Sequence, residues 1–111
     1  MKTPRKKLEK KADALFRDIV KRDGVCEKCG SREFLQCDHV VSRSYKQVRW
    51  DFNNAYCLCR KCHVSFTHHP LEWEDWVVEQ MGRSSYQMLK DKARQYGKID
   101  YEMIINRLNN D

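Results

Sequence analysis

Two cysteine pairs are the residues of this chain best suited to hold a metal. Cys26 and Cys29 form one C-x-x-C pair, Cys59 and Cys62 form another, and 29 residues separate the pairs. This spacing is typical of a tetrahedral zinc site, since two such turns present four thiolates with little strain. A shell of four thiolates leaves no open position for a substrate, so the zinc is expected to be structural. Redox-active cysteines are the competing interpretation, but those usually occur as a single pair after a strand of an α/β fold.

A second group of polar residues lies between and after these pairs. Asp38 and His39 are neighbours, Asn54 precedes the second pair, and His63 directly follows its last cysteine. A carboxylate and an imidazole can hold a divalent ion, and an imidazole with a pKa near ~6.5 can accept a proton at neutral pH. Taken singly, a histidine or asparagine is more often structural. The joint spacing therefore suggests a second metal, held for chemistry.

The composition indicates a polyanionic partner. Lysine and arginine number 22 against 16 acidic residues, which gives a formal charge of +6. Four thiolates around one zinc would be net negative, so the rest of the surface is more basic than this count and suits phosphates. No apolar run approaches the ~18 residues of a membrane span, and no secretory signal is legible at the N-terminus. We expect a cytoplasmic protein with no membrane partner, in which Cys37 and Cys57 are small buried strand residues.

The first 24 residues are predicted to be one helix and its stop signal. The helix is expected over residues 3–23, with Thr3 as the cap, Pro4 in the first helical position and Gly24 ending it. Apolar residues recur at helical spacing and predict one buried stripe. This stripe comprises Leu8, Ala12, Leu15, Phe16 and Ile19.

The central segment is predicted to be a strand, a loop, a strand and a helix around a metal. Residues 37–41 and 55–58 predict the strands, residues 42–54 the polar loop, and a helix is expected from Cys59 onward. Because successive side chains of a strand alternate, adjacent polar residues in the first strand are expected to do different jobs.

Helices are also predicted for the last third of the chain. Pro70 suits the start of one that ends before Gly82. Ser84 or Ser85 is expected to cap the next, and Asp100 the last. The whole chain therefore predicts one α+β domain without repeats or a linker.

These motifs resemble the HNH nuclease family. The resemblance rests on Asp-His-Val-Val at 38–41, on Leu-Cys-Arg-Lys-Cys-His at 58–63, and on Asn54 five residues before Cys59, and it covers residues 26–63. It implies a small zinc-stapled ββα-metal unit surrounded by N- and C-terminal helices. The expected organisation of the single HNH nuclease domain, residues 1–111, is an N-terminal helix (1–24), knuckles and ββα-metal motif (25–69), and a helical extension (70–111).

The resemblance also implies roles for particular residues. His39 would be the general base, and Asp38 with His63 would hold a catalytic divalent ion, Mg²⁺ or Mn²⁺ or another. Asn54 would orient the base or brace the loop, and its neighbour Asn53 is an alternative assignment. The two C-x-x-C pairs are the zinc knuckles of this family, and their cysteines would bind the structural zinc; they are Cys26, Cys29, Cys59 and Cys62.

Other residues receive less specific roles. The family often has a further metal ligand four residues after the helical histidine, where this chain has Thr67, so His68 is expected as a further ligand or phosphate contact. Arg43, Lys46 and Arg49 lie in the loop and would bind phosphates beside the scissile bond. Three tryptophans could stack on bases, although a place in the core is favoured in so short a domain. They are Trp50, Trp73 and Trp76.

The function implied is metal-dependent endonucleolytic hydrolysis of DNA phosphodiester bonds. The alternative is a non-catalytic, zinc-stabilised DNA-binding module. Less specific runs, such as Arg-Trp-Asp-Phe-Asn-Asn at 49–54, are similar to small phage and prophage HNH proteins. That similarity adds phage recombination or packaging machinery as an expected partner, while monomer and homodimer remain equally open.

Overall fold

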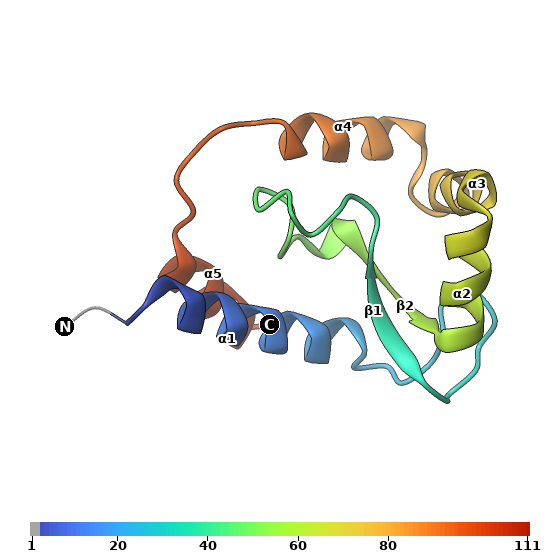
Figure 1. Ribbon diagram of the computed structural model, residues 1–111, viewed down its shortest axis with the longest axis horizontal. Coiled ribbons are helices and arrows are strands. Elements are labelled where there is room, and N and C mark those ends of the chain that lie inside the picture. The colour runs from blue at the N-terminus through green and yellow to red at the C-terminus, as the bar shows by residue number, and fades with distance from the viewer. Residues whose placement is uncertain (1–2) are drawn as a thin grey trace.

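The computed structural model describes residues 3–111, which form a two-stranded sheet with five helices around it (Figure 1). In chain order the elements are α1 (Arg5–Val20), β1 (Leu35–His39), the short 3-10 helix η1 (Phe52–Asn54), β2 (Ala55–Cys59), α2 (Arg60–His68), α3 (Pro70–Met81), α4 (Arg83–Ala93) and α5 (Tyr101–Asn109). The predicted α+β class is confirmed. Within this described part, no helix is long and apolar enough to cross a membrane.

Helix α1 packs against α5 and one face of the sheet, and the predicted apolar stripe is buried there. Ala12 and Phe16 are fully buried, and the other stripe residues pack around them. The predicted cap was wrong, because Pro4 rather than Thr3 occupies the N-cap position, and no side chain between residues 3 and 111 caps the helix. The carbonyl of Pro4 accepts from the backbone N–H groups of Lys7 and Leu8, so Thr3 lies outside the helical turn.

The two strands form an antiparallel hairpin in which Cys37 pairs with Cys57 and His39 with Ala55. Cys57 is buried, Cys37 is half-buried, and both are free thiols, as expected of small strand residues. The first strand ends at His39, two residues earlier than predicted. The reason is that Asn54 binds the backbone of the two residues after His39. Its backbone carbonyl accepts a hydrogen bond from the Val40 N–H, and its side-chain oxygen accepts one from the Val41 N–H.

The other face of the sheet is covered by α2 and α3. Trp73 and Trp76 of α3 lie in an aromatic cluster with Tyr56 and Phe66, and their own rings stack at 5.9 Å between centroids. Trp50 is buried in the α1–α5 core. All three tryptophans therefore pack in cores, as favoured from the sequence.

The C-terminal helices start and stop mostly where the sequence indicates. Gly82, with φ of +85°, ends α3 and directly precedes α4. The predicted serine cap was therefore wrong, because Ser84 and Ser85 already lie inside α4. Asp100 does cap α5, since its carboxylate accepts from the backbone N–H of Met103 at 3.0 Å.

Candidate active site and metal centre

The four knuckle cysteines converge on one point. The sulfur atoms of Cys26, Cys29, Cys59 and Cys62 all lie within 4.8 Å of one another, and none is in a disulfide. A turn after the first pair makes this possible, because Gly30 adopts φ of +80° and its N–H donates to the Cys26 carbonyl. The donor set and its spacing fit a four-thiolate zinc ion.

The backbone around the first knuckle favours a thiolate. Burial disfavours the charged form of Cys26, but backbone N–H groups of residues 28, 29 and 59 outweigh it and lower the pKa of this thiol to about 6. Zinc binds the thiolate rather than the thiol, so this ligand is prepared for the metal. The knuckle is also tied to β2, since the Glu27 carboxylate accepts from the Cys57 N–H at 2.6 Å.

The second knuckle connects the sheet to α2. Cys59 is the last residue of β2 and the N-cap of α2, and Cys62 lies in the first turn of that helix. His63 comes next, so the knuckle fixes where its side chain leaves the helix. The Nδ1 atom of His63 lies 2.9 Å from Oδ1 of Asp38 on β1.

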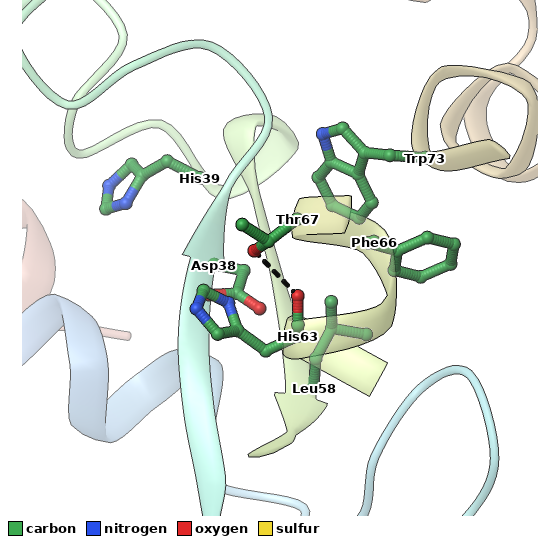
Figure 2. Close-up of a pocket in the computed structure, with 7 residues that line it drawn as sticks. All are labelled: Asp38, His39, Leu58, His63, Phe66, Thr67 and Trp73. Atoms are coloured by element: carbon green, nitrogen blue, oxygen red, sulfur yellow. Dashed lines mark hydrogen bonds and ion pairs between the residues drawn. The ribbon is translucent and has the colours of Figure 1, made fainter. Parts of the chain in front are cut away.

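Asp38, His39 and His63 line one cavity of about 130 Å³ (Figure 2). Its remaining walls are mostly apolar and are formed by Leu58, Phe66, Thr67 and Trp73. The second carboxylate oxygen of Asp38, Oδ2, is buried and has no hydrogen-bond partner among the described residues. Burial raises the pKa of Asp38 above its ordinary range, although His63 acts in the opposite direction. An unpartnered buried carboxylate oxygen beside an imidazole can receive a cation, because buried polar atoms otherwise find partners.

His39 projects to the other side of β1 from Asp38 and His63 (Figure 2). Its ring stacks on Phe16 of α1, with 5.6 Å between centroids, and its Nε2 lies 2.8 Å from the backbone carbonyl of Arg49. A carbonyl only accepts, so Nε2 carries the proton and Nδ1 keeps a free lone pair. Burial lowers the pKa of His39, although the bond to the Arg49 carbonyl opposes this. The ring is thus held in a neutral form that can accept a proton.

Asn54 braces the loop that carries this carbonyl. It is 0% exposed; its Oδ1 accepts from the Val41 N–H at 2.7 Å, and its Nδ2 donates to the carbonyls of Val41 and Val48 at 3.0 Å each. Asn53 is exposed; its backbone N–H donates to the Asp51 carboxylate, and its side chain has no hydrogen-bond partner among the described residues. The geometry therefore favours Asn54 over its neighbour for the loop-bracing position.

The three loop cations are paired with two acids of α1. Asp13 binds Arg43 at 2.9 Å and Arg49 at 2.6 Å, while Glu9 binds Lys46 at 3.0 Å and Arg49 at 3.3 Å. The side chains of Arg43 and Lys46 are 57% and 38% exposed, but that of Arg49 is only 10% exposed. The sequence reasoning missed both acids. Their signal was present, because Glu9 and Asp13 lie four residues apart and therefore share one face of a mostly basic helix.

His68 lies apart from this constellation. It is exposed at the end of α2 and does not line the cavity. Thr67 lines the cavity instead, and its hydroxyl donates to the carbonyl of His63 at 2.8 Å. The role of His68 as a further metal ligand or phosphate contact stays a prediction; on the helix this residue lies one position past Thr67, which lines the cavity.

Comparison with known proteins finds a family model that matches the segment carrying most of these residues. A family model described as HNH endonuclease matches residues 26–69. No curated protein and no solved structure matches the chain. The matched stretch contains the four cysteines and the residues Asp38, His39, Asn54 and His63, and it leaves α1, α3, α4 and α5 outside.

Proposed function

Because residues 26–69 carry an HNH endonuclease domain, we propose that this protein is a metal-dependent endonuclease that hydrolyses DNA phosphodiester bonds. One observation carries the proposal: Asp38 and His63 form a pair in a cavity where one carboxylate oxygen has no partner, and His39 borders the same cavity while its ring is held on the α1 side of β1. A cation-holding pair and a neutral imidazole on adjacent strand residues are groups that phosphodiester hydrolysis can use.

His39 is the proposed general base. Its Nε2–H is held by the Arg49 carbonyl, so Nδ1 is the atom that takes a proton from the attacking water. Phe16 fixes the plane of the ring through the stacking contact. Asn54 acts one step further away, since it holds the loop that presents the carbonyl.

Asp38 and His63 are the residues proposed to hold a catalytic divalent ion, Mg²⁺ or Mn²⁺. The bound ion would stabilise the charge that develops on the phosphate and on the leaving oxygen. The donors fit, because a carboxylate and an imidazole suit such ions while the four thiolates suit zinc. Because the two donor sets are separate, the catalytic ion would be removable without loss of the zinc.

The DNA contacts proposed from the sequence divide into two kinds. Arg43 and Lys46 are partly exposed, and their ion pairs with α1 can give way to phosphates, since exposed ion pairs are weak. Arg49 was proposed in the same role, but its side chain is held inside by Glu9 and Asp13. Its contribution to DNA binding is then the charge it adds rather than a direct contact.

A non-catalytic DNA-binding module is the second candidate, and one observation favours it. The helical position four residues after His63 holds Thr67, whose hydroxyl is already bonded to the backbone. The ion would therefore have two side-chain ligands in this cavity, so weak ion binding would leave only a basic, zinc-stabilised DNA platform.

Incubation with supercoiled plasmid and a panel of divalent ions separates these candidates. The nuclease proposal expects nicked or linear plasmid with Mg²⁺ or Mn²⁺, loss of cutting in His63→Ala, and native cutting in the matched control His68→Ala. A gel-shift assay measures binding in parallel. If the protein binds the plasmid but none of the divalent ions supports cutting, it is the DNA-binding module instead.

A further inference from the structure

The carbonyl that holds His39 is fixed by residues on both sides of it. The side chain of Asn54 donates to the carbonyl of Val48, one residue before Arg49. On the other side, the guanidinium of Arg107 on α5 donates to the carbonyl of Trp50 at 2.7 Å. The peptide group between Arg49 and Trp50, which supplies the carbonyl, therefore lies in a short stretch anchored at each end.

Asp13 of α1 binds both side chains that flank this peptide group. Its carboxylate accepts from Nε and Nη2 of Arg49 at 3.1 and 2.6 Å, and from the indole N–H of Trp50 at 2.9 Å. A guanidinium that bonds both oxygens of one carboxylate is fixed in direction as well as distance. The Asp13 side chain is only 15% exposed, so water competes weakly for these bonds. One carboxylate thus orients two consecutive residues and the amide plane between them.

We propose that Asp13 is a positioning residue that acts on His39 through the Arg49 carbonyl. The carbonyl meets His39 Nε2 at 2.8 Å and thereby selects the ring form with a free Nδ1. Asp13 lies outside the stretch that matches the HNH model, so α1 completes a site that the matched stretch does not complete alone. The kinetic part of this inference rests on the proposed nuclease activity, whereas the orientation of His39 does not.

The test compares Asp13→Asn with Asp18→Asn in the full chain. Both variants remove one negative charge from α1, but Asp18 is exposed and its side chain forms no hydrogen bond or ion pair among the described residues. We expect Asp13→Asn to lower kcat for plasmid cutting by roughly 10–100-fold, as small displacements of a reacting group do, with KM changed much less. Asp18→Asn should match the native protein. Zinc content and circular dichroism show whether each variant is folded.

A spectroscopic measurement reads the positioning directly. Nitrogen NMR of ¹⁵N-histidine protein, recorded above the usual histidine pKa, reports which ring nitrogen carries the proton. His39, assigned by its absence in His39→Ala, should carry it on Nε2 in the native protein and in Asp18→Asn. A mixture of the two forms is expected in Asp13→Asn. If the native protein cuts no plasmid but Asp13→Asn changes the ring form, the nuclease proposal fails and the positioning stands.

Arg49→Lys keeps the test decisive if Asp13→Asn does not fold. A lysine leaves the buried Asp13 charge neutralised but cannot bond both of its oxygens at once. The same changes in kcat and in ring form are expected, with smaller size. A folded Asp13→Asn or Arg49→Lys protein with native kcat and a native His39 signal would overturn the proposal.

Discussion

Asn54→Asp tests whether the loop is held by the donor of the Asn54 amide or merely by its bulk. Aspartate has nearly the same size and keeps the acceptor for the Val41 N–H, but it turns an oxygen toward the carbonyls of Val41 and Val48. The buried carbonyl of Val48, left without its donor, costs roughly 1–3 kcal/mol, and the half-buried carbonyl of Val41 costs less. We therefore expect a loss of roughly 1–4 kcal/mol, a sizeable part of the roughly 5–15 kcal/mol that stabilises a typical domain.

Denaturant unfolding, followed by circular dichroism at saturating zinc, measures this loss. Asn53→Asp is the matched control, because it introduces the same charge one residue away on an exposed side chain. Its unfolding free energy should stay within about 0.5 kcal/mol of native. Should Asn54→Asp unfold within that same margin, the amide donor does not brace the loop, and the route from Asn54 through Val48 to the Arg49 carbonyl is wrong.

Three further predictions concern the metals and the base. Cys29→Ser should lose zinc and largely unfold, because binding of this metal and folding are coupled; zinc analysis with a melting curve checks this, and an unchanged melting temperature would contradict it. His39→Ala should keep its fold and DNA affinity while turnover falls by roughly 10²–10⁴-fold; plasmid nicking at the native rate would exclude His39 as the base. Asp38→Asn and His63→Ala should each weaken the dependence of cutting on the divalent ion without removing zinc. Metal titrations with parallel zinc analysis measure this, and native titration curves for both variants would place the catalytic ion elsewhere.

The cluster of four cysteines and most of the helices could be predicted from the sequence. Ligand spacing is a local property, so two C-x-x-C pairs were enough to predict that four sulfur atoms would converge. Helical periodicity is also local, and the buried stripe of α1 appeared where it was expected. The match of residues 26–69 to the HNH model confirms the resemblance drawn from the same motifs.

The exact ends of helices and strands could not be predicted from the sequence. The first strand stopped at His39 because the N–H of Val41 donates to the Asn54 side chain rather than to the neighbouring strand. Strand propensities describe single residues and do not predict such a side-chain bond. The first helix began without a side-chain cap because Pro4, rather than Thr3, took the N-cap position. Such boundaries follow from tertiary context and local steric limits rather than from composition.

The contacts between α1 and the loop were the largest omission. Arg49 looked like a phosphate ligand, because a basic residue in a polar loop gives no sign of an internal partner 36 positions earlier. Only the packing of α1 against the sheet brings Asp13 under the loop. Glu9 and Asp13 lie four residues apart in the sequence and indicate an acidic face on α1, but nothing in the sequence indicates which basic residue packs against that face, so the Arg49 side chain was expected to be exposed.

The hairpin lets one small sheet orient the side chains of two neighbouring residues, Asp38 and His39, through two different helices. Alternation along β1 sends Asp38 toward α2 and His39 toward α1, so each side chain is oriented by a different helix (Figure 2). The zinc knuckle fixes the start of α2 and, through it, His63 beside Asp38. His39, the proposed base, is held separately, through Phe16, Asp13 and the Arg49 carbonyl. If the proposed roles are correct, the second cysteine pair sets the geometry of the proposed cation-holding pair, while α1 sets the geometry of the proposed base, and Asp38, His39 and His63 all border the same cavity.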